Sequence, residues 1–399
     1  FIMKAVDNLT RLPQIYITTD NNLEINSKDE YVTGEVTLVL NGYTQRDDLE
    51  GVRLKIRLRG NSTSVMPKKA YKIKFYTKTE FLSDYREKDW LLIANYVDHT
   101  LIRNSLAYSL SANLNIGFTP RYVFADVYVN GEYQGNYMVT DQIEITNDRV
   151  DIEENVPEID TGYLVELDIG LYREGLENTD DNFFLIDNMP FVLHSPDYKD
   201  DHYFLEQKQF IKDYFVEVLD TLKNKEDYSQ LIDEESFIDW YIVNELFKNV
   251  DAGYSSVYFN KDKGGLLKMG PVWDFDLSTG NPGYLHDRGP EGWYVGQEYK
   301  NIFYYHLLQY PEFREHLKDR WNEIYDTKIL TLLPEIHAMA DSMTYSRYQN
   351  FLLWEVIGID QDWYTAPEIY ELKTYDEQVW FLYDYLATRI EWMNEEFNK

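Results

Sequence analysis

Short runs in which apolar and polar side chains alternate fill the first half of the chain. Because a strand turns successive side chains to opposite faces, such alternation indicates β-structure. It predicts strands at residues 15–18, 35–40, 52–59, 70–75, 122–129, 137–140 and 162–168. Asn130-Gly131 predicts a tight hairpin turn, and a second hairpin is predicted around Asn188. One helix, at about residues 100–114, interrupts this series of strands.

Apolar positions at helical spacing dominate the second half. They predict helices at residues 202–224, at 234–249 and from about 301 to the end, with two strands at 256–260 and 266–270 between them. A Gly-rich aromatic loop at residues 277–299 follows the strands. A long loop beside a site is typical of a lid or a substrate surface. We therefore expect an α+β fold, with strands concentrated in the first half and helices in the second.

Two of the predicted strands carry basic side chains along one face. The polar positions are Lys55, Arg57 and Arg59 in the first strand, and Lys72 and Lys74 in the second. If the two strands pair, these faces merge into one basic platform. Such a platform suits an anionic ligand such as a nucleotide phosphate. Lysines that discourage edge pairing on a solvent-facing strand explain the pattern equally well.

Three of the four aspartates in residues 244–281 are candidate site residues. Asp251 lies in a predicted loop, and Asp274 and Asp276 follow the second strand in the order Trp-Asp-Phe-Asp. In an extended segment the last two would share one face, while the aromatic residues anchor the other. Two carboxylates so placed suit a hard cation, and the third is then left to accept a proton. Magnesium-dependent phosphoryl transfer requires both roles. Solvated turns and helix caps use aspartate as well, so this pattern alone is a weak signal.

Composition narrows the function classes. The chain has 399 residues, and its 38 Lys and Arg against 70 Asp and Glu give a formal net charge of −32. Such a charge repels nucleic acid and anionic membranes and favours cations or basic partners. The absence of cysteine excludes disulfides, thiolate metal sites and a cysteine nucleophile. No apolar run approaches the roughly 18 residues that span a bilayer, so we expect no membrane insertion.

Several longer motifs occur in one order along the chain. They are LPQIYITTD at residues 12–20, RLRGNST at 57–63, KKAYKIKF at 68–75, WLLIANYVDHTLIRNSLAYSLS at 90–111, YVNGEYQGNYMVTDQIE at 128–144, GYLVELD at 162–168, NVDAGYSSVYF at 249–259 and MGPVWDFDLSTGN at 269–281. Together they resemble the spore-coat-protein-H-like (CotH) kinases, atypical members of the protein-kinase-like fold. The resemblance covers nearly the whole chain.

For the fold, the resemblance implies a bilobal, protein-kinase-like unit that spans residues 1–399. A strand-rich N-lobe would occupy about residues 1–200. A mostly helical C-lobe would occupy about residues 201–399 and carry the catalytic aspartates.

For the activity, the resemblance implies an ATP- and metal-dependent kinase that acts on serine or threonine hydroxyls of a serine-rich protein. By the family's pattern, Asp251 orients the acceptor hydroxyl or takes its proton. Asp274 holds the metal, with Asp276 beside it. Magnesium is the expected ion, with manganese and calcium as alternatives. Phosphoryl transfer also needs a cation on the phosphates.

Lys74 is the first choice for this phosphate-binding cation, with Lys72 and Arg59 as substitutes. Glu144 is a candidate ion-pair partner for the lysine.

The chain also departs from ordinary protein kinases. No GxGxxG loop precedes the lysine strand, no His-Arg-Asp triplet precedes Asp251, and Asp276 stands where the usual Asp-Phe-Gly has glycine. Ser256 occupies the position of the asparagine expected five residues after the catalytic aspartate. Asn281 is therefore the candidate for the second metal ligand, and residues 57–64 are the segment left to cover the phosphates.

Two other classes of function remain open. A non-catalytic or pseudokinase surface module would bind calcium through its acidic loops, and carbohydrate or a protein partner through residues 284–299. Calcium-dependent stability without ATP binding would favour the non-catalytic module, whereas a pseudokinase would retain nucleotide binding. A glycoside hydrolase would use a carboxylate pair such as Asp251 and Asp274. Sugar hydrolysis, however, gives no use for the basic platform.

The location is expected from the resemblance alone. The chain opens Phe-Ile-Met-Lys without a signal-peptide pattern, so we expect that a targeting segment has been trimmed away. An extracytoplasmic setting, on the spore surface or secreted or cell-surface in a bacterium, follows from the family. The acidic charge is compatible with each of these settings.

Overall fold

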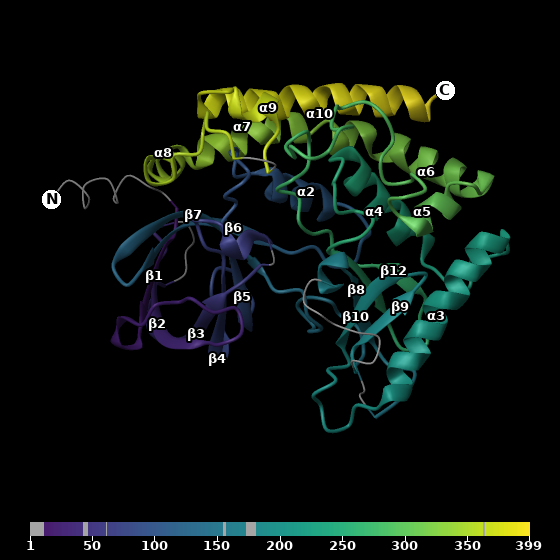
Figure 1. Cartoon of the computed structure of the whole chain (residues 1–399), viewed down its shortest axis with the longest axis horizontal. Helices are drawn as coiled ribbons and strands as arrows, with labels where there is room; N and C mark the ends of the chain where they lie inside the picture. Colours follow the sequence, from purple (N-terminus) through teal and green to yellow (C-terminus); the bar gives the residue numbers. More distant parts are fainter. Residues whose placement is uncertain (1–11, 43–46, 61, 155–156, 173–180, 362–363) are drawn as a thin grey trace. The chain divides into compact units, whose positions relative to one another are not determined.

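The chain divides into two compact units that interleave along the sequence. The structure is a computed structural model that describes residues 12–42, 47–60, 62–154, 157–172, 181–361 and 364–399 (Figure 1). Unit 1 comprises Phe1–Ser105, Arg121–Gln142 and Pro334–Phe381. Unit 2 comprises Leu106–Pro120, Ile143–Leu333 and Leu382–Lys399.

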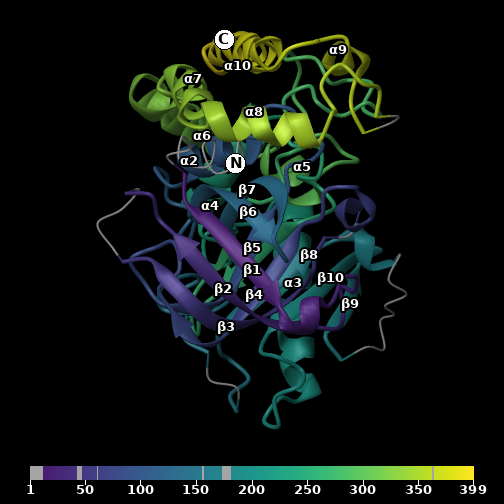
Figure 2. The same cartoon turned by 90° about the vertical axis from the view of Figure 1, so that its left-hand side faces the viewer.

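Unit 1 is built on a closed barrel with the strand order β1-β2-β3-β4-β5-β7-β6 (Figure 2). Its strands are β1 (Gln14–Thr19), β2 (Val32–Val39), β3 (Leu49–Leu58), β4 (Tyr71–Thr79), β5 (Glu87–Ile93), β6 (Tyr122–Val129) and β7 (Glu132–Asp141). β1 and β6 pair in parallel, with Gln14 opposite Asp126 and Ile17 opposite Val129. The other neighbours are antiparallel. The β1–β6 pairing closes the barrel, and a closed barrel has no edge strand.

The alternation of the strands accounts for the barrel core. One face of each strand is apolar and buried, as at Ile15, Val36, Leu54 and Ile73, which are all fully buried. The predicted hairpin turn between β6 and β7 is confirmed, because Asn130 and Gly131 have φ values of 51° and 84°. Local sequence therefore determines both the inward face and this turn.

Helix α8 (Thr344–Leu353) is held against β7 by buried polar side chains of unit 1. Asn350 Oδ1 accepts hydrogen bonds from the Asn136 N–H at 3.1 Å and from Lys68 Nζ at 2.9 Å. Lys68 Nζ also donates to the Ala94 carbonyl at 2.7 Å. Burial lowers the pKa of Lys68 to about 7. These groups satisfy one another, as buried polar groups must.

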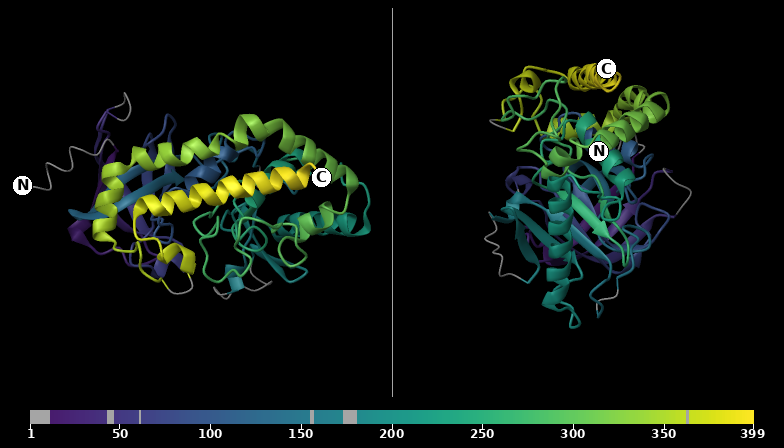
Figure 3. Two further views of the ribbon diagram at one scale, coloured as in Figure 1. Left: turned by 90° about the horizontal axis from the view of Figure 1, so that it is seen from above. Right: turned by 90° about the vertical axis from the view of Figure 1, so that its right-hand side faces the viewer.

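Unit 2 contains a five-stranded sheet in the order β12-β11-β8-β10-β9. Its strands are β8 (Tyr163–Leu167), β9 (Phe183–Ile186), β10 (Met189–Ser195), β11 (Val257–Lys261) and β12 (Leu267–Met269), and all neighbours are antiparallel. Helix α3 (Leu205–Asn224) lies along this sheet (Figure 3). Its Phe215 packs against Phe191 and Phe259, each with ring centroids 5.1 Å apart. Aromatic packing therefore joins the helix to the sheet.

The other helices follow common capping and packing rules. They are α2 (Arg103–Ser111), α4 (Glu234–Leu246), α5 (Ile302–Leu307), α6 (Pro311–Ile324), α7 (Leu332–Ser342), α9 (Pro367–Tyr370) and α10 (Tyr375–Phe397), with short 3-10 helices at Asp20–Asn22, Ser62–Val65 and Ile169–Tyr172 and a π-helix at Tyr325–Ile329. Asp233 caps α4 by accepting the Ser236 N–H at 3.0 Å. Trp321 of α6 donates to Asn394 Oδ1 of α10 at 3.1 Å. Among the described helices, none has the length and apolar content that crossing a membrane requires.

The expected bilobal protein-kinase-like fold is wrong. β1 pairs with β6 as well as with β2, so the strands of the first half close into a barrel. β11 and β12, expected within a helical C-lobe, join β8, β9 and β10 in one sheet. Strands and helices are therefore not segregated into two halves of the chain. Alternation predicts where strands form, but it does not specify which strands become neighbours.

Candidate functional site

The candidate site begins in unit 2, where α4 leads into the turn that carries Asp251. Asn249, only 2 % exposed, organises this turn. Its Oδ1 accepts the Asp251 N–H at 3.1 Å, and its Nδ2 donates to Asn244 Oδ1 at 3.1 Å and to the Trp273 carbonyl at 3.3 Å. One buried side chain thus ties the backbone of Asp251 to the residue that precedes Asp274.

Asp274 lies at a sharp bend of the chain. Its φ of 65° falls in the left-handed region, which aspartate tolerates better than most residues. Ser256 also has a positive φ, of 56°, and its Oγ donates to Asp274 Oδ2 over a long 3.4 Å. The turn after Asp251 and the bend at Asp274 are therefore adjacent at the level of side chains.

The extended segment predicted around Asp274 is not present. β12 ends at Met269, and the positive φ at Asp274 interrupts the alternation. The aromatic residues are nevertheless buried as expected, with Phe275 packed on Phe247 at 5.6 Å between ring centroids. Asp276 is 8 % exposed, whereas Asp274 is half-buried. The two carboxylates therefore differ in their access to solvent.

Asn281 is fully buried and stabilises the turn after Asp276. Its Nδ2 donates to the Asp276 carbonyl at 2.7 Å. Ser278, in the same turn, is also fully buried, and its Oγ has no hydrogen-bond partner within the described chain. A buried hydroxyl of this kind is consistent with a further polar ligand group. Aspartate and hydroxyl oxygen atoms are the ligands that a hard cation prefers, and a metal site shared by these residues stays a prediction.

Asp168, a further carboxylate beside this turn, was missed by the sequence analysis. It follows β8, is 6 % exposed, and accepts Ser255 Oγ–H at 2.5 Å and the Gly170 N–H at 2.8 Å. The Ile169 N–H donates to the Tyr254 carbonyl at 2.6 Å. The end of β8 therefore holds residues 254–255, just after Asp251. The available signal was an aspartate at the end of a mostly apolar strand.

Two tyrosines of the Gly-rich loop lie close enough to Asp251 to feel its charge. Burial, followed by the negative charge of Asp251, raises the pKa of Tyr284. Burial is also the main cause of the raised pKa of Tyr294. Tyr294 Oη donates to the Val250 carbonyl at 3.0 Å and accepts from Lys300 Nζ at 2.9 Å. Both phenols therefore remain neutral beside the carboxylate.

Part of the loop expected as a lid or substrate surface is anchored in the core. The Glu245 carboxylate accepts the N–H groups of Tyr294 and Val295, each at 2.7 Å. Arg389 pairs with Glu245 at 2.5 Å and donates to the Gly292 carbonyl at 2.7 Å. Glu245 and Arg389 are fully buried. Residues 292–295 are therefore fixed to buried side chains, which argues against a role as a movable lid.

The candidate phosphate-binding cations lie on the barrel of unit 1. The predicted pairing of their strands is confirmed, with Lys74 opposite Lys55 and Lys72 opposite Arg57. Asp89 of β5 forms ion pairs with Lys72 at 3.0 Å and with Lys74 at 3.4 Å. The Lys72 side chain is 18 % exposed and that of Lys74 is 48 % exposed. Lys72 is therefore the more buried cation of the two.

The remaining sequence-predicted residues are also placed. Arg59 follows β3, and its N–H donates to the Ala70 carbonyl at 3.0 Å. Glu144 of unit 2 forms an ion pair with the buried Arg149. In the segment expected to cover the phosphates, Asn61 lies outside the described residues. A meeting of Lys72, Lys74 and Arg59 with the aspartates stays a prediction.

Acidic side chains that lie close together can act as metal ligands. Within the described ranges, no three His, Cys, Asp or Glu side chains come together in a way that could hold a metal ion. A calcium site built from several carboxylates alone therefore has no candidate in that part of the chain. A site that combines one or two aspartates with hydroxyl or amide oxygens is a different arrangement and remains compatible with the turn around Asp274.

Comparison with known protein families gives one match. Residues 56–393 match the family described as "CotH kinase protein". The chain belongs to the CotH kinase protein family. A search of curated proteins finds no match. The CotH match includes every candidate site residue and begins within β3, so β1 and β2 precede it.

CotH membership suggests a kinase-like role for this chain. The site residues of unit 2 stand on elements inside the CotH match, and Asn249 and Asp168, which organise them, lie inside it as well.

Proposed function

We propose that this CotH protein transfers the γ-phosphoryl group of ATP to serine or threonine hydroxyls of a protein. Family membership supports a kinase-like role. The observation that carries the finer assignment is the side chain of Asn249, which bonds to the Asp251 N–H and to the Trp273 carbonyl. It joins the turn that carries Asp251 to the residue before Asp274, which supports a site that uses both carboxylates, as phosphoryl transfer does.

Asp251 is proposed as the group that receives the acceptor. Its carboxylate orients the hydroxyl and takes the proton as the oxygen attacks the γ-phosphorus, while the bond to the ADP oxygen breaks. The buried Asn249 and the Asp168–Ser255 hydrogen bond hold its turn. Such positioning accounts for most of the catalysis in phosphoryl transfer, because the protein contributes little covalent chemistry.

Asp274, with Asp276, is proposed to hold the divalent ion. Magnesium, or manganese in its place, neutralises charge on the phosphates when bound. Ser256 contacts the Asp274 carboxylate from the Asp251 turn. Asn281 supports the same bend by binding the Asp276 carbonyl. Because its amide nitrogen is the donor in this bond, its amide oxygen is the atom proposed as a further ligand of the ion.

Lys72, Lys74 and Arg59 are proposed to bind the phosphates of ATP. Asp89 forms ion pairs with both lysines and would orient them. In protein kinases the phosphate-binding lysine likewise forms an ion pair with a carboxylate, that of a glutamate. Because Asp89 pairs with both lysines, we propose it for this role in place of Glu144, which pairs with Arg149.

The acceptor is proposed to be a serine-rich protein outside the bacterial cytoplasm, on a spore or cell surface or secreted. The net charge of −32 is compatible with this setting.

The decisive experiment incubates the chain with γ-labelled ATP, magnesium or manganese, and a serine-rich acceptor. Mass spectrometry then locates phosphate on the acceptor and on the chain itself. We expect Asp251→Asn to lower transfer by a factor of about 10³ or more while nucleotide binding persists, since the removal of a catalytic proton acceptor acts on the chemical step. We expect Asp274→Asn to weaken metal-dependent nucleotide binding as well.

Asp319→Asn is the matched control, because Asp319 is an exposed carboxylate on α6. It should transfer phosphate as the unaltered chain does. Transfer at the unaltered rate by Asp251→Asn would refute the role of Asp251. Metal-dependent ATP binding without any transfer, under all conditions, would support the pseudokinase alternative.

A further inference from the structure

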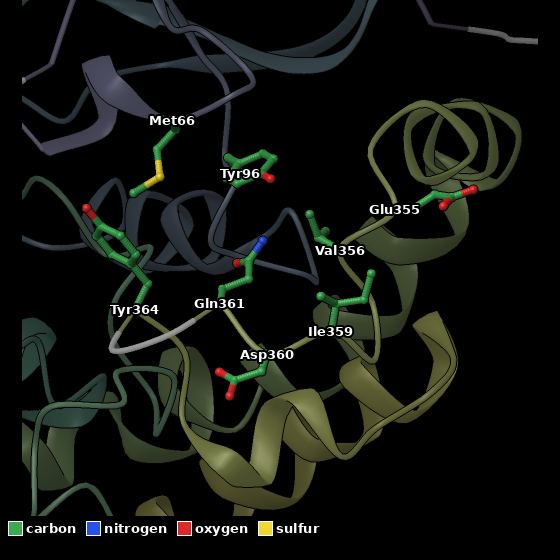
Figure 4. A pocket seen from close by; sticks show the side chains of 8 residues that line it. All are labelled: Met66, Tyr96, Glu355, Val356, Ile359, Asp360, Gln361 and Tyr364. Atoms are coloured by element: carbon green, nitrogen blue, oxygen red, sulfur yellow. The ribbon is translucent and has the colours of Figure 1, made fainter.

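A cavity of about 280 Å³ lies within unit 1. Its lining comes from the segment before β4, the segment after β5 and the chain after α8 (Figure 4). The lining residues are Met66, Tyr96, Glu355, Val356, Ile359, Asp360, Gln361 and Tyr364. The volume equals the share of about nine water molecules at about 30 Å³ each. It is large enough for a small organic molecule.

Gln361, a polar residue of the lining, is oriented by a buried histidine. His99 is fully buried, and its Nε2 lies 3.3 Å from Gln361 Oε1. A carbonyl oxygen cannot donate, so the proton resides on Nε2 of a neutral imidazole. Burial lowers the pKa of His99 to about 4, which keeps this neutral form. The Gln361 amide nitrogen is therefore directed away from His99, toward the side of Tyr96 (Figure 4).

The walls of the cavity are apolar and aromatic. Met66 and Val356 are buried, at 6 % and 4 % exposure. Figure 4 shows Met66, Tyr96 and Tyr364 around one space, with Gln361 between the two tyrosines. The faces of tyrosine rings attract cations because their quadrupole is negative. Such walls accommodate an apolar body and favour a positive charge close to it.

The charges at the rim have one sign. Glu355 and Asp360 are exposed, and no Lys, Arg or His is among the eight lining residues. An anionic ligand such as a phosphate or a carboxylate would therefore meet only repulsion from charged groups of the lining. A ligand with a positive charge would gain from the Asp360 carboxylate and from the tyrosine rings.

We propose that this cavity binds an organic cation: an ammonium group carried on an apolar body. The apolar body lies against Met66, Val356 and Ile359. The ammonium group lies toward Asp360 at the rim and within reach of the tyrosine faces. The cavity is independent of the proposed phosphoryl transfer, because none of its residues belongs to the candidate catalytic set.

The test titrates the full chain with phenethylamine by isothermal calorimetry, beside phenethyl alcohol and 3-phenylpropionate. These probes share an aromatic body and differ in charge. We expect the amine to bind at least tenfold more tightly than the alcohol, and the carboxylate not to bind. Equal binding of the amine and the alcohol would overturn the proposal.

Variants place the binding in this cavity. We expect Asp360→Asn to weaken amine binding at least fivefold, and Val356→Trp to abolish it by filling the space. Asp341→Asn, the same change at an exposed position of α7, should leave binding unaltered. Undiminished amine binding in Asp360→Asn would overturn the assignment. This test does not depend on whether Val356→Trp folds.

A peptide probe distinguishes two sources of the ammonium group: a lysine side chain of a polypeptide and a free amine. Acetyl-Gly-Lys-Gly-amide presents a lysine ammonium on an alkyl stem within a polypeptide. Tighter binding of the peptide than of phenethylamine, with the same loss in Asp360→Asn, supports a lysine side chain as the occupant. The reverse order supports a free amine. Binding of neither probe overturns the proposal.

Discussion

At the residue scale, the hydrogen bond between Ser255 and Asp168 gives a sharp test of positioning. Ser255 Oγ donates to the buried Asp168 carboxylate at 2.5 Å, four residues after Asp251. Ser255→Ala removes this restraint on the turn without altering any proposed catalytic group. We expect kcat for phosphoryl transfer to fall about ten- to a hundredfold, because small misplacements of reacting groups are costly. KM for ATP should change little.

The control for this prediction is Ser229→Ala, an exposed serine of unit 2. Steady-state kinetics of both variants at saturating acceptor would separate the two cases. An unaltered kcat in Ser255→Ala would contradict the positioning role. A matched loss in Ser229→Ala would show that the effect is not specific to this turn.

His99 gives a second test at the residue scale, through pH. Burial lowers its folded-state pKa to about 4 from 6.5, although the nearby charge of Asp98 opposes this shift and that of Arg103 adds to it. Between pH 4 and 6.5 the unfolded state therefore binds more protons, so stability is lost as the pH falls through this window. At 1.36 kcal/mol per pKa unit the loss amounts to about 3 kcal/mol.

The measurement compares the free energy of unfolding in urea, from pH 6.5 down to pH 4.5, for the unaltered chain and for His99→Gln. Glutamine retains an amide donor toward Gln361 but does not titrate. Carboxylate titration is common to both chains and cancels in the difference. The variant should lose less stability over the interval. Parallel curves would show that His99 does not titrate as a buried neutral group.

At the scale of elements, the strands and turns were largely predictable from the sequence, because their signals are local. Leu54, Ile56 and Leu58 alternate with basic residues along β3, and all three are buried. Asp187 and Asn188 both have positive φ values between β9 and β10, near the predicted turn. Side-chain period and turn chemistry involve only neighbouring residues, so one sequence suffices to read them.

The partners of the elements could not be read in the same way. The parallel contact of β1 with β6 joins residues more than a hundred positions apart and leaves no local signal. The bend at Asp274 was missed because aspartate is common in both extended and left-handed conformations of loops. Asn249 was missed for a related reason: its value lies in bonds to Asp251 and Trp273 that form only after folding.

The contact of α8 with β7 gives a prediction at this scale. Asn350 Oδ1 accepts from Lys68 and from the Asn136 N–H, so Asn350→Leu leaves two buried donors without this acceptor. We expect the free energy of unfolding to fall by about 3 kcal/mol, the size of the penalty for buried unpaired polar groups. Gly135→Ala should also destabilise, since its Cβ would lie 2.6 Å from Asn350 Oδ1.

The matched control is Gln349→Leu, the same substitution at the preceding position of α8. Its effect on stability should stay within about 0.5 kcal/mol, as for most substitutions away from a buried network. Urea unfolding, together with hydrogen exchange of the β7 amides, measures both variants. Equal stability of Asn350→Leu and Gln349→Leu would show that the polar network does not hold the helix.

At the scale of the whole molecule, charge is the dominant property. A formal net charge of −32 over 399 residues destabilises a compact chain through self-repulsion. Raising NaCl from about 10 mM to about 100 mM shortens the Debye length from about 30 Å to about 10 Å. We expect this change to raise the midpoint of thermal unfolding by about 3 °C, since each kcal/mol shifts the midpoint by a few degrees in domains of this size.

Magnesium at matched ionic strength separates screening from binding. An ion that binds only the folded chain adds stability in proportion to the logarithm of its concentration above its dissociation constant. If Asp274 holds such an ion, MgCl₂ should raise the thermal midpoint beyond the NaCl value, and Asp274→Asn should lose this excess while keeping the NaCl effect. Asp319→Asn should keep both effects. A midpoint that is insensitive to NaCl would contradict the role of self-repulsion, and an equal magnesium excess in Asp274→Asn would place the bound ion elsewhere.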